Sequence, residues 1–247
     1  MIRDFTSTRL FVEAPLAGGA VVALDARQAN YLINVLRLGD GDVVLIFNAA
    51  DGEWRAALQA AGRRQWQLTA VAQTRPQTPR PDLHYLFAPL KHARLDYMVE
   101  KAVEMGAGRL RPVITRHTQV TRVNVERMRA NAIEAAEQCG ILSLPEIDEP
   151  VAVADMLSRW AANEGGRRLI FCDEGEGAAS PVVTLAGLRG APLAVLVGPE
   201  GGFADEERAR LKALPFVTAI SLGPRILRAD TAAIAALAVV QAAAGDW

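Results

Sequence analysis

The stretch LVGPEGGFADEE, residues 196–207, joins an apolar run to a helix-like segment. A strand, a glycine-rich turn and a helix in this order are typical of an α/β domain and often hold a phosphate. A P-loop, however, needs Lys-Ser or Lys-Thr after its last glycine, and here Phe203-Ala204 follow. Glu200 in the middle of the turn would also repel a phosphate at short range. We therefore expect either a ligand other than a phosphate or a turn that uses glycine only for its backbone freedom.

A second loop, SLGPRILRADTAA at residues 221–233, also places Gly-Pro between an apolar run and a helix-like segment. Asp230 or Thr231 is placed to cap that helix, whereas Arg225 and Arg228 have no such structural role. Ligands of parallel α/β sheets bind beyond the carboxyl ends of the strands. Two glycine–proline loops at neighbouring strand ends would therefore frame an uncharged or zwitterionic ligand through their backbone groups.

The C-terminal part of the chain alternates short apolar runs with segments of helical periodicity, which favours an α/β domain with a mostly parallel sheet. The expected strands cover residues 83–90, 110–115, 167–175, 192–198 and 216–223, and the expected helices cover residues 94–106, 125–140, 205–214 and a final segment from Thr231. The final helix is apolar all round apart from Thr231 and Gln241, so it should be covered on every side. We expect a second copy of the chain to cover it in a homodimer.

The stretch TRPQTPRP, residues 74–81, contains three prolines and no large apolar residue, so we interpret it as a stiff linker. Before it, residues 1–73 contain short strand-like runs separated by Gly, Asp and Asn, and one helix-like segment at residues 26–38. We expect a small barrel of about five or six strands with one helix in residues 1–73. The α/β domain should occupy residues 82–247.

The composition, 51% hydrophobic and 22% charged in 247 residues, is that of an ordinary soluble globular protein. No apolar run is long enough to span a bilayer, and MIRDFTSTRL has no apolar core of signal-peptide length, so we expect a cytoplasmic location. The two cysteines and three histidines are scattered without metal-ligand spacing. We therefore expect no metal site, and cysteines that are free, buried or half-buried thiols.

Charge is unevenly distributed along the chain, although the net charge is −1. Residues 109–129 hold six arginines against one acid, Glu126. This excess suits either a patch that meets phosphates or a solvated helix face. In the N-terminal part we interpret Arg55, Arg63 and Arg64 as solvated.

Together, LVGPEGGF and SLGPRILRADTA closely resemble the two C-terminal motifs of the RsmE-type 16S ribosomal RNA uridine-N3 methyltransferases, S-adenosylmethionine-dependent enzymes of the SPOUT class. NVLRLGDGD (34–42), RLDYMVEKAVEMG (94–106) and IEAAEQCG (133–140) resemble further motifs in the family's order, so the likeness covers the chain. The resemblance implies a PUA-like RNA-binding barrel, then a SPOUT domain with a deep trefoil knot. It also implies a homodimer through that domain, with S-adenosylmethionine as the cofactor.

The activity implied by this resemblance is transfer of a methyl group to N3 of a specific uridine in 16S ribosomal RNA, either free or in the assembled small subunit. The two loops would bind the cofactor. By the matching motifs, the cofactor-binding residues are Leu196, Gly198, Pro199, Glu200, Gly201, Gly202, Leu222, Gly223, Ile226, Leu227 and Arg228.

Arg228 is the leading candidate for a catalytic group, because loss of the N3 proton spreads negative charge that a positioned donor would stabilise. Its alternative roles are binding an RNA phosphate and pairing with Glu200. Glu137 lies on the polar side of its helix, and we interpret it either as solvent-exposed or as the proton acceptor. The candidates for RNA contacts are Arg9, Arg37, Lys91, Arg111, Arg116 and Arg122.

Two other functions stay open. One is a SPOUT methyltransferase that acts on another base or on a ribose 2′-hydroxyl, and the other is a non-catalytic RNA-binding protein. Mapping of the methylated atom separates the first from the family's reaction, and binding of S-adenosylmethionine separates the second. A nucleotide-dependent enzyme is disfavoured, because the P-loop lysine is missing and Glu200 is present.

Overall fold

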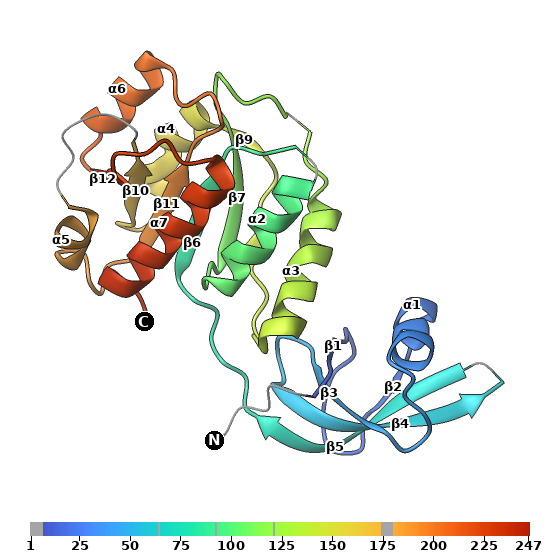
Figure 1. Cartoon of the computed structure of the whole chain (residues 1–247). Helices are drawn as coiled ribbons and strands as arrows, with labels where there is room; N and C mark the ends of the chain where they lie inside the picture. The colour runs from blue at the N-terminus through green and yellow to red at the C-terminus, as the bar shows by residue number, and fades with distance from the viewer. Residues whose placement is uncertain (1–6, 64, 92, 121, 174–179) are drawn as a thin grey trace. The chain divides into compact units, whose positions relative to one another are not determined.

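The structure, a computed structural model, describes residues 7–63, 65–91, 93–120, 122–173 and 180–247. Arg64 and the end of the strand expected at residues 167–175 therefore lie outside the described residues. The chain divides into two compact units, one of residues up to 79 together with residues 133–144, and one of residues 80–132 and 145–247 (Figure 1). Residues 133–144 thus belong by their contacts to the N-terminal unit.

The N-terminal unit is built on a five-stranded sheet with the strand order β1-β3-β4-β5-β2. The strands are β1 (Arg9–Phe11), β2 (Val21–Ala23), β3 (Val43–Phe47), β4 (Glu53–Gly62) and β5 (Gln65–Arg75). β1 pairs with β3 in parallel, and the other pairs are antiparallel. One face carries the core, in which Val44, Ile46, Ala56, Leu58 and Leu68 are buried, as expected for a sheet with period-2 side chains.

The helix of this unit is shorter than the sequence predicts. α1 (Ala26–Asn30) begins after Asp25, whose carboxylate accepts a hydrogen bond from the Gln28 backbone N–H at 2.7 Å. This is the first half of a capping box. The chain continues as a π-helical turn, η1 (Tyr31–Val35). Arg37 has a φ of +59°, and this left-handed conformation ends the helical path.

The opposite face of the same sheet is partly covered by the segment 133–144. Phe11 and Phe47 pack against Ala136 and Leu142 there, and the two phenylalanine rings meet edge to face with centroids 5.6 Å apart. Removal of this apolar surface from water explains why the unit includes a segment far away in sequence.

The C-terminal unit is an α/β domain with a parallel sheet, as predicted. Its strand order is β12-β10-β11-β6-β7-β8, with β9 also paired to β7, and every pair is parallel. The strands are β6 (Leu83–Phe87), β7 (Arg109–Ile114), β8 (Glu146–Ile147), β9 (Val151–Ala152), β10 (Arg168–Cys172), β11 (Leu193–Val197) and β12 (Val217–Ile220). β11 is buried at every position, which fits the unbroken apolar run of a central parallel strand.

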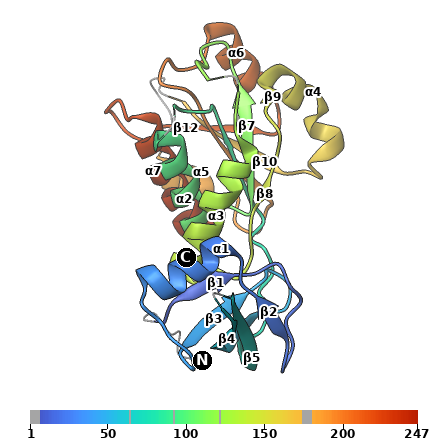
Figure 2. The same ribbon diagram turned by 90° about the vertical axis from the view of Figure 1, so that its right-hand side faces the viewer.

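Helices cover both faces of this sheet. α2 (Ala93–Glu104) and α7 (Ala229–Ala244) pack side by side on one face, α5 (Pro181–Ala186) packs on α7, and α4 (Val153–Asn163) covers the other face (Figures 1 and 2). α4 contributes Met156, Leu157 and Trp160 to a core cluster that includes Leu86 and Phe171. α3 (Val125–Cys139) and α6 (Asp205–Ala213) complete the helices of the described chain.

Four elements have no counterpart among those predicted: β8, β9, α4 and α5. α7 begins two residues before the expected Thr231. Gln241 in α7 is buried, and its Nε2 donates a hydrogen bond to the Met105 carbonyl at 2.7 Å.

Cys172 is partly buried, whereas Cys139 is exposed, contrary to the expectation of covered thiols. Within the described ranges no helix is long and apolar enough to cross a membrane, and no three His, Cys, Asp or Glu side chains gather as a metal would require.

An ion-pair cluster lies at the amino ends of β6 and β7. Glu164 accepts a hydrogen bond from Arg111 Nη1 at 2.6 Å, and His84 Nδ1 lies 3.4 Å from the other carboxylate oxygen. The Glu164 side chain is only 6% exposed. Burial by itself would raise the pKa of Glu164, but His84 and Arg111 outweigh burial and lower the pKa from 4.5 to about 2.

We expect Glu164→Gln to destabilise the protein at neutral pH and much less in acid. A carboxylate whose pKa falls on folding stabilises the folded state above the unfolded pKa of 4.5, and this stabilisation is lost as the pH falls through about 2. The loss at pH 7 should be at most about 3 kcal/mol. Urea unfolding between pH 7 and pH 2.5 measures it, with the exposed Glu149→Gln as control. A Glu164→Gln penalty that does not shrink below pH 4.5 would disprove the coupling.

Candidate functional site

The glycine-rich turn after β11 is tight. The Gly202 N–H donates to the Pro199 carbonyl at 2.9 Å, and Gly202 has a φ of +66°, which favours glycine. Leu196 and Pro199 are buried, whereas Glu200 and Gly201 are exposed. The turn thus presents backbone groups and one carboxylate at the carboxyl end of a buried strand.

Position 198 has no room for a side chain, because the Phe203 ring lies against Gly198. A Cβ at Gly198 would be 2.5 Å from Cε2 of Phe203, too close for any side chain. Phe203 is 7% exposed and meets Phe171 of β10 edge to face, with ring centroids 5.0 Å apart. The loop between β11 and α6 is therefore anchored in the core by one aromatic ring.

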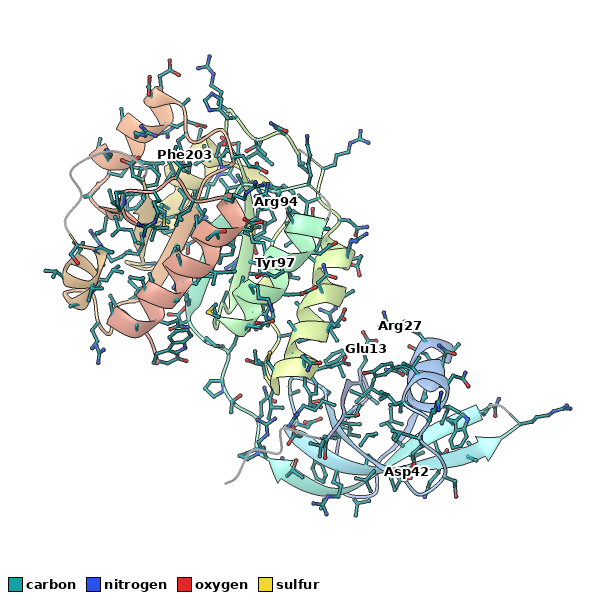
Figure 3. The ribbon with its side chains drawn as sticks, viewed as in Figure 1. Glu13, Arg27, Asp42, Arg94, Tyr97 and Phe203 are labelled. Carbon is teal, nitrogen blue, oxygen red and sulfur yellow. The ribbon has the colours of Figure 1, made fainter. Side chains whose placement is uncertain are left out.

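Arg94 links the two glycine–proline loops. Its Nη1 donates to Glu200 at 2.8 Å, and its Nε donates to Asp230, in the first turn of α7, at 3.0 Å. Arg94 lies in the first turn of α2, near the start of α7 (Figure 3). The partner of Glu200 is thus Arg94 and not Arg228, which corrects one of the roles considered for Arg228.

The same bridge sets the ionisation of its members. The hydrogen bond from Arg94 is the main reason why the pKa of Asp230 is lowered, and the hydrogen bond to Asp230 raises the pKa of Arg94. The third nitrogen, Nη2 of Arg94, is buried and has no hydrogen-bond partner in the described part of the chain. A buried donor without a partner is costly unless a ligand satisfies it.

The second loop leads from β12 to α7. Gly223 has a φ of +104°, Leu222 and Leu227 are partly buried, and Ile226 is 91% exposed. Arg228 occupies the N-cap position of α7, but its side chain makes no capping hydrogen bond. Because α7 begins at Ala229, Asp230 and Thr231 lie inside its first turn, and the expectation that one of them is the cap is wrong. Asp230 accepts hydrogen bonds from Arg94 and from the Thr231 backbone N–H.

The two loops do not follow neighbouring strands, because β10 lies between β11 and β12 in the sheet. The segment from Ser221 to Arg228 leaves the edge strand β12, yet Asp230 just after it contacts Arg94, which follows β6. The chain therefore crosses the carboxyl ends of β10 and β11, and this crossing brings the loops together.

A third segment, after β7, meets the glycine turn. His117 Nδ1 lies 3.1 Å from the Gly201 carbonyl and 3.3 Å from that of Gly202. The Arg116 backbone N–H donates to Glu207 at 2.9 Å, and its guanidinium pairs with Glu206 at 2.8 Å. Arg116 and Glu206 are largely exposed, so their ion pair contributes little to stability.

The predicted RNA-contact residues differ in their exposure and in whether their charges are already paired. Arg9 is 8% exposed and donates to Glu53 at 2.9 Å, and Arg111 is held by Asp148 and Glu164. Arg37, Lys91 and Arg122 are exposed, and their side chains have no hydrogen bond or ion pair with the residues that the structure describes. Only these last three present charges that need no rearrangement to meet a phosphate.

Glu137 belongs to the N-terminal unit by its contacts, whereas both loops belong to the C-terminal unit. Its carboxylate accepts a hydrogen bond from the Phe11 backbone N–H at 2.7 Å. Burial raises the pKa of Glu137, and the Phe11 hydrogen bond offsets only part of that rise. The side chain is partly buried, so the interpretation of Glu137 as a solvent-exposed group is wrong.

The arrangement can hold a ligand through backbone groups and place an arginine beside it. The sequence predicts a role for the two loops and Arg228, but it assigns none to Arg94 or His117. Both come from segments far away in sequence, and neither has a local pattern that marks it. Only the crossing of the chain over β10 and β11 brings Arg94 to both loops.

Two family models match the chain. The model described as the RNA methyltransferase domain matches residues 76–241, and the one described as the RNA methyltransferase PUA domain matches residues 24–70. Among curated proteins, the ribosomal RNA small subunit methyltransferase E of Rickettsia conorii is 30% identical over 235 residues, which cover 94% of each chain. Its counterpart in Bacillus subtilis is 25% identical over 229 residues, with 88% of each chain covered.

Solved structures give the same likeness. A protein from Legionella pneumophila, in complex with its bound cofactor S-adenosylmethionine, is 28% identical with a TM-score of 0.82, covering 98% of this chain and 99% of that one. A ribosomal RNA small subunit methyltransferase E from Neisseria gonorrhoeae, bound to S-adenosylmethionine, has a TM-score of 0.84 at 24% identity, again covering 98% and 99%. At that identity the second likeness concerns the fold.

Proposed function

The chain belongs to the ribosomal RNA small subunit methyltransferase E family, and from this membership we propose that it transfers a methyl group from S-adenosylmethionine to N3 of a uridine in 16S ribosomal RNA. Methylation of ribosomal RNA with S-adenosylmethionine follows from the family and its relatives. The choice of N3 of a uridine rests on the resemblance of the two loop motifs. The structural observation that carries the cofactor part of the proposal is the bridge of Arg94 to Glu200 and Asp230, which joins the two loops and leaves one buried donor of Arg94 without a partner in the described chain.

The loops fit this cofactor in two respects. The glycine turn offers backbone groups and no lysine, which suits a zwitterionic ligand better than a phosphate ester. The buried Nη2 of Arg94 is a donor without a partner among the described residues, beside both loops. We propose that Leu196, Gly198, Pro199, Glu200, Gly201, Gly202, Leu222, Gly223, Ile226, Leu227 and Arg228 line the cofactor site.

When bound, S-adenosylmethionine supplies a methyl group that is already activated by a sulfonium, so the protein contributes alignment and electrostatics. In the proposed transfer, N3 of the uridine would give up its proton to a group of the protein and take the methyl group from the sulfonium. Arg228 would donate hydrogen bonds to the carbonyl oxygen on which negative charge develops, and its exposed guanidinium has no partner in the described chain. Glu137, with its raised pKa, is the proposed proton acceptor.

RNA binding is proposed for the N-terminal unit, whose sheet we infer closes into a PUA-like barrel. We also infer that the crossing segment before α7 threads a deep trefoil knot. Arg37, Lys91 and Arg122 are the exposed candidates for phosphate contacts. Contacts from Arg9, Arg111 and Arg116 would require release from their present ion pairs. The uridine must be unpaired or flipped out, because base pairing occupies N3.

We propose that the protein forms a homodimer through its C-terminal unit. We propose a cytoplasmic location as well. α7 leaves Ala242 exposed and Ile234 only partly covered, and Tyr97 on the neighbouring α2 is 44% exposed. These apolar side chains suit a second copy of the chain. Light scattering at micromolar concentration should give twice the mass of the chain, and a monomer would remove the dimer from the proposal.

Isothermal titration calorimetry with S-adenosylmethionine tests the cofactor part of the proposal. We expect one binding site per chain, with S-adenosylhomocysteine competing for it. A chain that binds small-subunit ribosomal RNA and no S-adenosylmethionine would be a non-catalytic RNA-binding protein, and the proposed activity would then be wrong.

A further inference from the structure

The N-terminal unit contains a recess of about 410 Å³ on the sheet face opposite its core. Its lining comes from the residue Ser7 before β1 and from the strands β3, β4 and β5. The lining residues are Ser7, Val43, Leu45, Glu53, Arg55, Thr74 and Arg75. All of them belong to the N-terminal unit, so the recess does not depend on the C-terminal unit.

The recess exists because the segment 133–144 covers only part of that sheet face. Phe11 and Phe47 are covered by this segment. Further along β3, Val43 is 52% exposed although it is apolar, and Arg55, the cross-strand neighbour of Leu45, is exposed. Val43 thus offers an exposed aliphatic surface to the recess, and Leu45, which is 4% exposed, lies beneath it as the floor.

The deep wall of the recess is a satisfied ion-pair network. Glu53 is 2% exposed and accepts hydrogen bonds from Arg9 at 2.9 Å, from Arg75 at 2.9 and 2.6 Å, and from Thr74 at 2.8 Å. Arg75 also donates to the Gly140 carbonyl at 3.0 Å. Burial alone would raise the pKa of Glu53, but these hydrogen bonds lower it, so the group stays ionised and its charge is balanced.

Arg55 is the charged residue of the lining that is free to bind a ligand. Its guanidinium has no hydrogen bond or ion pair with any residue of the described chain. With Arg55 and Arg75 against Glu53, the lining has a formal balance of +1. The interpretation of Arg55 as a merely solvated residue does not take account of this recess, which forms only when β3, β4 and β5 pair.

We propose that this recess binds one unpaired nucleotide of the RNA substrate, with the base over Val43 and Leu45 and the phosphate at Arg55. The volume lies within the range of small-molecule sites and suits a single nucleotide. Apolar floor, polar wall and one free guanidinium match the base and phosphate of an extruded nucleotide. A recess of this size does not admit a duplex. The inference rests on the proposed function in taking RNA as the polymer.

The test compares Arg55→Gln with Arg63→Gln in the full-length protein. Arg63 is exposed at the β4–β5 hairpin and lies outside the recess, so both variants lose the same charge from the same strand pair. The probes are a fluorescein-labelled single-stranded oligouridylate of twelve nucleotides and a blunt RNA duplex of the same length. Fluorescence anisotropy at 50 to 300 mM KCl gives the affinity and its salt dependence, and thermal unfolding checks the fold of each variant.

We expect Arg55→Gln to weaken single-strand binding about 10-fold and to reduce the salt slope by about 0.7, the value for one phosphate contact. Duplex binding should be unchanged, as should single-strand binding by Arg63→Gln. Arg55→Lys should keep the salt slope, because it keeps the charge. An equal loss in Arg63→Gln, an equal loss on the duplex, or no loss in Arg55→Gln would each overturn the proposal.

Calorimetry with S-adenosylmethionine on the same variants separates this proposal from the proposed function. Arg55→Gln should bind the cofactor as the unchanged protein does. A protein that fails to bind S-adenosylmethionine but shows the Arg55 effect on single-stranded RNA would lose the methyltransferase assignment and keep the nucleotide recess.

Discussion

Replacement of Arg228 by methionine is expected to lower the kcat of methyl transfer about 100-fold, with a change in S-adenosylmethionine affinity of less than about threefold. Arg228 stands just before α7, is exposed, and has no hydrogen bond or ion pair from its side chain in the described chain. A donor that acts only on charge developed in the transition state affects kcat more than ground-state binding. Single-turnover transfer of labelled methyl groups to 16S ribosomal RNA measures the effect.

The matched control for this substitution is Arg225→Met. Arg225 lies in the same loop, is exposed, and likewise has no side-chain partner among the residues described. It should retain most of the activity, and Arg228→Lys should restore part of the rate lost in Arg228→Met, because a lysine keeps the charge but not the planar fork. Equal losses of kcat in both methionine variants would mean that the loop only contributes positive charge to RNA binding.

Replacement of Arg94 by methionine is expected to weaken S-adenosylmethionine binding about 10- to 100-fold. The change removes two charge-assisted hydrogen bonds, each contributing about 1.5–3 kcal/mol when partly buried, and leaves Glu200 and Asp230 unpaired. Solvent screening places the expected effect in the lower part of that range, because the Arg94 side chain is 32% exposed. Calorimetry gives the affinity directly.

Arg127→Met is the control for Arg94→Met. Arg127 pairs with Asp96 on α2 at 2.6 Å, is 62% exposed, and makes no contact with Glu200 or Asp230. It should leave cofactor affinity unchanged. If Arg94→Met also bound S-adenosylmethionine normally, while thermal unfolding showed both variants folded, the bridge would not organise the cofactor site.

Much of the C-terminal fold could be predicted from the sequence, because its strands are unbroken apolar runs and its loops carry Gly-Pro. α4 was open to prediction as well, since Val153, Met156, Leu157 and Trp160 have the spacing of one helix face. β8 and β9 have two residues each, which is too short for an alternating pattern of apolar and polar residues to be recognised. The predicted start of α7 came two residues too late, because Asp230 and Thr231 are residue types that favour a cap but lie inside the first turn of the helix.

The site was predictable only in part. Local patterns indicate a glycine turn and an arginine before a helix, but they do not show that β10 lies between β11 and β12. Nor do they show that α2 supplies the arginine that joins the loops. Glu137 followed the helical pattern to the polar face of α3, yet Phe11 of β1 contacts it, a pairing of residues 126 positions apart. Long-range contacts of this kind have no signature in a single sequence.

The most direct test of the proposed function is methyl transfer from S-adenosylmethionine to 16S ribosomal RNA that lacks the modification, supplied free and in assembled small subunits, with the methylated atom mapped by mass spectrometry. We predict one methyl group per RNA, at N3 of a uridine, transferred by the unchanged protein and about 100-fold more slowly by Arg228→Met. A methyl group on a ribose 2′-hydroxyl or on another base, or no transfer by a protein that binds both S-adenosylmethionine and the RNA, would contradict it.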